Sequence, residues 1–184
     1  MKKILGGLLL LSILFTSCSS DENDDNNSSI SATINGVEWK PTKINSVTLI
    51  KISGSGQRFD INIQDDSQML MLACESDFTS KDAMPLKEYN FYEDLEDTDG
   101  DEWIPSDALF VNTYLIDGNT YTEHMPVVGK MTITAMDPEK KTVSGTFSFK
   151  AEKGGALQTK IVTPDIFEVK NGVFNNLSYT VLSQ

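Results

Sequence analysis

Ten consecutive residues in the middle of this chain, 93–102, carry seven carboxylates and no base. Crowded carboxylates repel one another, and a hard cation that takes about six to eight oxygen ligands relieves this repulsion. Asp97, Asp99 and Asp101 alternate around Gly100, so three side chains can turn inward as the chain curls. We therefore predict these aspartates as metal ligands and calcium as the candidate cofactor. The alternative is a solvated acidic loop without a metal.

Aromatic side chains flank the acidic run. Tyr89 and Tyr92 precede it and Trp103 follows it. Flat rings beside carboxylates and amides are typical of carbohydrate-binding faces, because stacking is combined with hydrogen bonds to sugar hydroxyls. We predict that these three residues bind a ligand, with a glycan as the candidate partner. Core packing explains Phe91 equally well, and Trp39 is expected in the core.

Residues that could act as a nucleophile or a general base are few. His124 is the only histidine, and its place near Pro126 favours a surface position. Cys74 ends an apolar run and is expected to be a small buried hydrophobe. Gly54-Ser55-Gly56 lacks the wider frame of a nucleophile elbow and indicates a turn. Zinc sites that need several histidines or cysteines are excluded by their number. The sequence predicts a protein that is not an enzyme, with a hydrolase that uses unidentified carboxylates on glycan or peptide as the alternative.

The N-terminus has the pattern of an export signal. Lys2 and Lys3 precede an apolar run over 4–15, which is shorter than the roughly 20 residues that span a bilayer. Cys18 follows directly after small residues, and this arrangement resembles the lipobox of bacterial lipoproteins. The resemblance implies that 1–17 is a signal peptide, that Cys18 is diacylated, and that this lipid attaches the mature protein to a membrane.

The residues after Cys18 are polar. Residues 19–29 include no apolar side chain and four acids, so we expect 18–29 to be a flexible, lipidated tether. Acids at this place also resemble the surface-export signal of Bacteroidetes lipoproteins. That resemblance implies an outer-membrane protein exposed at the cell surface, and a plain solvated spacer is the alternative.

Length and charge limit the remaining possibilities. Residues 30–184 suit a single domain with one core. The formal charge is −12 for the whole chain and −14 without Lys2 and Lys3. An excess of this sign repels phosphate backbones, so nucleic acid is excluded as a partner.

From Ile30 onward, apolar and polar residues alternate with a period of two, and no stretch of ten residues has a helical stripe. Strands over 130–135 and 142–151, joined by a turn at 137–141, predict a β-hairpin. The pair Asn171-Gly172 predicts a second hairpin between strands at 165–170 and 174–182. Further strands are expected at 30–35, 44–52, 57–64, 68–75, 108–116, 120–124 and 157–163. The predicted fold is all-β, an antiparallel two-sheet β-sandwich, with a small closed or partly open β-barrel as the alternative.

Three segments, 32–39, 143–149 and 170–177, resemble a family of uncharacterised all-β lipoprotein domains of Bacteroidetes. The resemblance brackets nearly the whole domain and carries over no catalytic residue. We therefore expect an outer-membrane lipoprotein with a non-catalytic binding or structural β-domain, whose partner is a glycan or an envelope protein.

Overall fold

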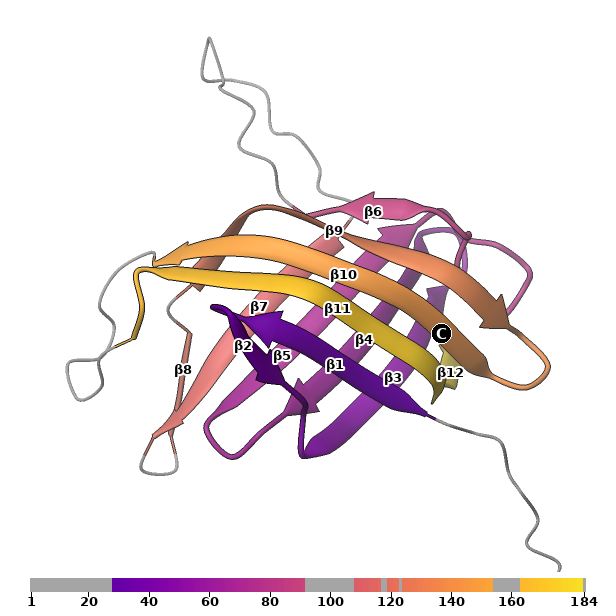
Figure 1. The fold of residues 1–184 in the computed structure, drawn as a ribbon. Helices are drawn as coiled ribbons and strands as arrows, with labels where there is room; N and C mark the ends of the chain where they lie inside the picture. Colours follow the sequence, from indigo (N-terminus) through magenta and orange to yellow (C-terminus); the bar gives the residue numbers. More distant parts are fainter. Residues whose placement is uncertain (1–27, 92–107, 117–118, 123, 154–162, 184) are drawn as a thin grey trace, which may run out of the picture.

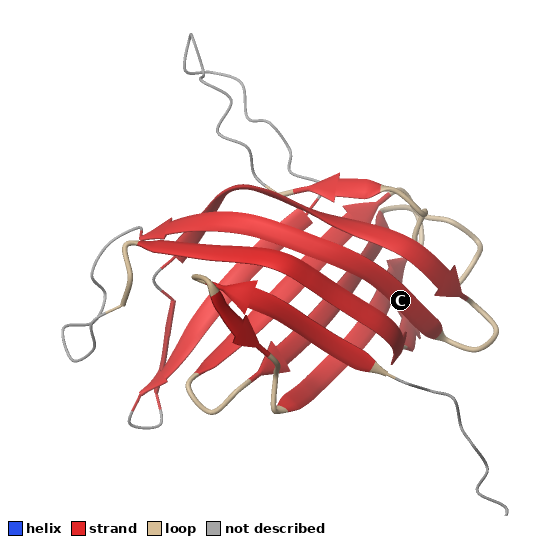
Figure 2. Cartoon of the chain, in the orientation of Figure 1, coloured by secondary structure: helices blue, strands red, loops and turns tan. Residues whose placement is uncertain are grey.

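The computed structural model describes residues 28–91, 108–116, 119–122, 124–153 and 163–183. All regular structure in these ranges is β-strand, with turns and loops between the strands (Figure 2). Figure 1 shows the strands in two sheets, one packed over the other. The predicted all-β fold and two-sheet β-sandwich are confirmed, and the sheets do not close into a barrel. Across the same ranges we find no apolar helix of membrane-spanning length.

The first sheet, sheet A, contains β1 (Ser29–Ile34), β2 (Val37–Trp39), β6 (Glu88–Asn90), β9 (His124–Asp137), β10 (Thr142–Lys153) and β11 (Ile166–Ser178), in the order β2-β1-β11-β10-β9-β6. The second, sheet B, contains β3 (Lys43–Ile52), β4 (Gly56–Gln64), β5 (Gln68–Ser76), β7 (Ala108–Ile116), β8 (Asn119–Thr122) and β12 (Thr180–Ser183), in the order β12-β3-β4-β5-β7-β8. Neighbouring strands are antiparallel except β12 and β3, which are parallel.

The core lies between the sheets and follows the alternation in the sequence. Every second residue of β10 from Val143 to Ala151 is buried, and the residues between them face outward. The predicted hairpin of β9 and β10 is confirmed. In sheet B, Phe59 and Ile61 are fully buried, and so is Cys74, as expected. Each large apolar side chain moved from water into this core contributes about 1.5–3 kcal/mol.

The prediction of a hairpin turn at Asn171-Gly172 is wrong. β11 continues through this pair and remains paired with β10 on both sides of it. Phe147 lies opposite residue 172 and Phe149 lies opposite Val169, so β11 has one residue more than β10 between these pairs. This is a β-bulge. Asn171 has a φ of 52°, and a left-handed asparagine serves a bulge as well as a turn.

The chain changes sheets at Tyr179. The strand expected over 174–182 is therefore divided: Ser178 ends β11 in sheet A, and Thr180 begins β12 in sheet B. Tyr179 is buried, and its hydroxyl donates to the backbone carbonyl of Asp82. The C-terminal strand thus forms one edge of sheet B.

The N-terminal hairpin of β1 and β2 turns at Asn35 and Gly36, whose φ angles are 48° and 83°. Two successive positive φ angles are typical of a type I′ turn. Trp39, which was expected in the core, is only partly buried and packs against the core from its rim.

Candidate functional site

The outer surface of sheet A is polar and rich in hydroxyl groups. On β10, Ser144, Thr146, Ser148 and Lys150 alternate with the buried residues and therefore point away from sheet B. Thr132 of β9 lies opposite Thr146 and extends the polar row to the next strand. Side chains opposite one another on neighbouring strands are about 5 Å apart. These groups therefore form one continuous hydrogen-bonding surface.

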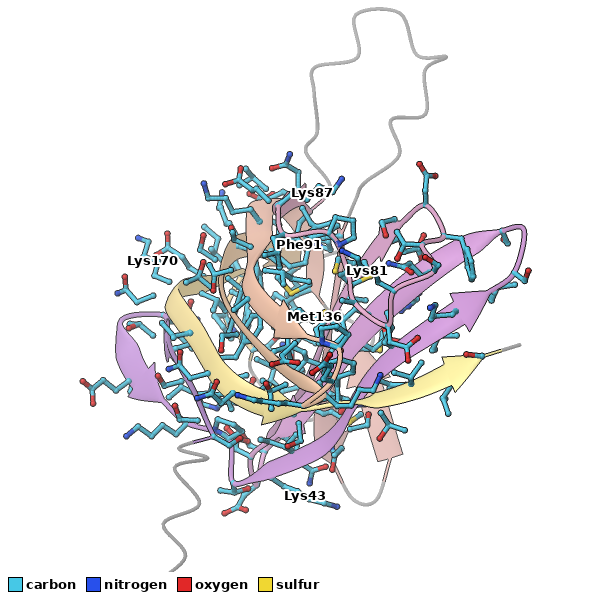
Figure 3. All side chains as sticks on the ribbon, turned by 90° about the vertical axis from the view of Figure 1, so that its right-hand side faces the viewer. Lys43, Lys81, Lys87, Phe91, Met136 and Lys170 are labelled. Atoms are coloured by element: carbon cyan, nitrogen blue, oxygen red, sulfur yellow. The ribbon has the colours of Figure 1, made fainter. Side chains whose placement is uncertain are left out.

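A shallow hollow of about 440 Å³ lies in this surface. We call it the outer hollow and define it by seven polar residues from four strands: Glu88, Asn90, Lys130, Ser148, Lys150, Glu168 and Lys170. A second depression of about 540 Å³ adjoins it and shares Lys130, Ser148 and Lys170. In Figure 3, Lys170 lies on the outer side of sheet A, whereas Phe91 lies in the interior.

Irregular strand pairing explains why the surface is hollowed here. Ser148 faces two residues of β11, Lys170 and Asn171, at the bulge described above. On the other side of β10, the register with β9 shifts between Lys150 and Ala151. Bulges bend a strand and increase its twist. Because the pairing of β10 is irregular on both sides within a few residues, the sheet bends around Ser148.

Gly129 forms part of the floor of the outer hollow. Its φ is 154°, and a Cβ at this position would meet the Cβ of Phe149 at 2.3 Å. A side chain would therefore push β9 away from β10, and only glycine permits this close approach.

Each lysine of the outer hollow has a glutamate partner at 2.8 Å. The pairs are Lys130 with Glu88, Lys150 with Glu152, and Lys170 with Glu168. All six side chains are at least 37% exposed, so water screens these pairs and they add little to stability. The charged groups are therefore available for hydrogen bonds to a ligand.

The arrangement is suited to recognition by hydrogen bonds. Asn90 and Ser148 both lie opposite Lys130 in register, so an amide, an ammonium group and a hydroxyl are neighbours. Ammonium groups donate, carboxylates accept, and hydroxyl and amide groups do both. A polyhydroxylated ligand, whose hydroxyls also donate and accept, matches such a mixture.

The prediction of Tyr89 as a ligand-stacking residue does not fit its position. Tyr89 is 0% exposed, and its hydroxyl donates to the carbonyl of Pro85 at 2.7 Å. The three residues of β6 alternate, so Tyr89 faces the core while Glu88 and Asn90 face outward. The ring therefore presents no surface to a ligand. Glu88 and Asn90, its neighbours on β6, do face outward, and both line the outer hollow.

The other predicted site residues lie outside the described residues. These are the lipidation residue Cys18, the ligand-binding residues Tyr92 and Trp103, and the calcium ligands Asp97, Asp99 and Asp101. Their roles stay predictions. The described residues that flank 92–107, Phe91 and Ala108, form a β-bridge. Among the described residues, no three histidine, cysteine or acidic side chains are grouped to hold a metal ion.

His124, expected at the surface, is buried and only 2% exposed. It begins β9, and its Nε2 lies 2.8 Å from the carbonyl oxygen of Pro164. Its ring centroid lies 5.9 Å from that of Tyr114 and 5.6 Å from that of Phe167. β9 continues through Pro126, at the place where the register with β10 shifts.

The fold and the site together define a β-sandwich with a polar hollow on one outer face. In comparisons with known proteins, no family model, no curated protein and no solved structure matches the chain. Its function is therefore inferred from its own residues.

Proposed function

We propose that this protein is an outer-membrane lipoprotein, exposed at the cell surface, that binds a glycan in the outer hollow without catalysing a reaction. The observation that carries the binding is the bend around Ser148. It gathers ammonium, hydroxyl, amide and carboxylate groups from four strands into one concave surface.

The charge distribution supports a neutral or weakly anionic glycan. The chain as a whole carries −12, which repels polyanions. The lining of the outer hollow instead has three lysines and two glutamates, Glu88 and Glu168. A ligand with many hydroxyls and few negative charges is not repelled by the chain as a whole, and it can bond to both the lysines and the glutamates of the outer hollow.

The N-terminal sequence supports attachment through Cys18. The sandwich begins at Ser29, which pairs with Asn175 at one end of sheet A. Between Cys18 and Ser29 the chain can extend to at most about 40 Å, which allows the domain to stand clear of a lipid surface. Cys18→Ala should abolish acyl labelling and release the protein from the membrane fraction. Acyl labelling that persists in this variant would contradict the lipoprotein assignment.

The binding is tested with the mature full-length chain on arrays of neutral and acidic polysaccharides. Ser148→Tyr fills the outer hollow, whereas Ser46→Tyr places the same ring on exposed outer surface of sheet B and serves as the matched control. We expect Ser148→Tyr to weaken binding at least about tenfold, which corresponds to about 1.4 kcal/mol, and Ser46→Tyr to leave it unchanged.

Two results would overturn the proposal. If Ser148→Tyr and Ser46→Tyr weaken polysaccharide binding equally, or if the wild type binds no polysaccharide, the outer hollow is not the binding site. Release of soluble fragments from a bound polysaccharide would show catalysis and favour the hydrolase.

A further inference from the structure

The core of the sandwich contains an amide that lacks hydrogen bonds. Asn112 on β7 is 0% exposed, and neither its Nδ2 nor its Oδ1 has a partner in the protein. Buried amides are hydrogen-bonded in nearly all native proteins, because an unpaired group loses the bonds it would make to water. A buried amide without a protein partner therefore marks a place for a bound molecule.

His124 supplies a second unpartnered group at the same end of the core. Its Nε2 lies 2.8 Å from the backbone carbonyl of Pro164, and a carbonyl oxygen only accepts hydrogen bonds. In the neutral ring, Nε2 therefore holds the proton and Nδ1 is an acceptor. This Nδ1 is buried and has no partner in the protein.

Tyr114 connects the two groups in space. It follows Asn112 by two residues, so both side chains point to the same side of β7, about 7 Å apart along the strand. The ring of Tyr114 is 5.9 Å from that of His124, and β7 packs against β9. Gln68, opposite Tyr114 on β5, is also buried. Asn112, His124 and Gln68 thus bring three buried polar side chains to the edge of the apolar and aromatic cluster between the sheets.

We infer that this end of the sandwich encloses a binding site for a small uncharged hydroxylic molecule, either water or a polyol. One hydroxyl donates to Oδ1 of Asn112 and accepts from Nδ2 of Asn112, and a second hydroxyl, of the same polyol or of a second water, donates to Nδ1 of His124. This inference does not depend on the proposed function of the outer hollow.

The polarity of the three atoms selects an uncharged ligand. A cation would meet the protons of Nδ2, and an anion would meet the lone pairs of Nδ1 and Oδ1. A hydroxyl group or a water molecule is donor and acceptor at once. It therefore satisfies neighbours of both kinds.

The first experiment is a high-resolution crystal structure of the full chain, grown and frozen without added polyols. We expect an ordered molecule within about 3 Å of the Asn112 amide. A dry site in which this amide bonds to protein atoms would overturn the inference.

A second experiment distinguishes the two sources of the hydroxyl group. The melting temperature is measured against increasing glycerol, erythritol and glucose, for the wild type and for Asn112→Leu, which keeps the shape of the side chain. If the melting temperature of the wild type alone rises and then saturates with polyol concentration, the site binds a polyol, because a ligand of the native state stabilises it by mass action. If the melting temperatures of both proteins rise equally and linearly, the polyol acts by exclusion from the protein surface. The ordered molecule in the crystal is then water. If Asn112→Leu does not fold, the wild-type structure and the form of the wild-type titration decide the question.

Discussion

The indole Nε1 of Trp39 donates a 2.6 Å hydrogen bond to Oδ2 of Asp65, and this bond joins a hairpin of sheet A to a turn of sheet B. Asp65 also accepts from the backbone amides of Ser67 and Gln68, at 2.7 and 2.9 Å. Partial burial opposes ionisation of Asp65, but these hydrogen bonds outweigh it and hold the pKa of its carboxyl below the ordinary value.

The first prediction concerns this contact. Trp39→Phe keeps an aromatic ring but removes the N–H donor, and we expect it to lower the free energy of unfolding by about 1 kcal/mol at pH 7. Because the folded-state pKa of Asp65 is lowered, its contribution is present above the unfolded pKa near 4 and is lost as the pH falls through the folded value. The variant should therefore lose less stability than the wild type between pH 5 and pH 2. Denaturant titrations at several pH values measure this, and parallel pH curves would contradict it.

The second prediction compares the two faces of β10. Phe147→Ala removes a side chain that is 2% exposed, so it should cost about 3–5 kcal/mol in chemical denaturation. Ser148→Ala lies on the outer face and should change stability by about 0.5 kcal/mol or less. Similar losses in both variants would show that this strand is covered on both sides.

The third prediction concerns Lys51, which is buried although it carries a charge. Its Nζ lies 2.9 Å from Oδ1 of Asp82 and 3.0 Å from the carbonyl of Lys81, while Lys141 binds the other oxygen of Asp82 at 2.7 Å. Asp82→Ala leaves the buried ammonium of Lys51 without its carboxylate, whereas Lys51→Met removes the charge and keeps an apolar stem. Asp82→Ala should therefore destabilise the fold more than Lys51→Met does. Thermal unfolding at pH 7 measures the order of the two variants, and the reverse order would refute this account of the buried ammonium.

The fourth prediction concerns alkaline pH. Burial, with smaller contributions from the charges of Asp82 and Asp137, raises the pKa of Tyr179 to about 12. The neutral phenol is therefore favoured in the folded state, and its contribution is complete below pH 10 and is lost as the pH rises from about 10 to about 12. Tyr179→Phe should lose less stability than the wild type across this interval, while both should behave alike between pH 6 and pH 8. An alkaline loss of stability that is the same in both proteins would assign the titration to another group.

The alternation of residues along each strand was sufficient to predict the sandwich and its core. In β10 the pattern is local, so Phe147 and Phe149 could be assigned to the interior and Ser148 to the surface from sequence alone. At Asn171 the local conformation is the same for a turn and for a bulge, and only the pairing of β11 with β10 distinguishes them.

The outer hollow could not be predicted for a related reason. Its residues were recognisable as the polar side of their strands, but the bend that gathers them depends on register shifts between strands that are distant in sequence. Tyr89 and His124 were misjudged because a single polar aromatic residue gives little indication of the strand face on which it lies. Their positions follow from the pairing of β6 and β9 within sheet A.

If the chain is exported as proposed, the strand order determines when the domain can be completed. Ser29 of β1 pairs with Asn175, and Leu49 of β3 pairs with Val181. A chain that crosses a membrane from its N-terminus therefore cannot complete either sheet before β11 and β12 emerge. Until then β1 and β3 each have an edge without its final partner, and such edges invite pairing with other chains. Pairing of β11 with β1 and of β12 with β3 is thus the closing step of assembly, and a chain that lacks these two strands would remain open at both sheets.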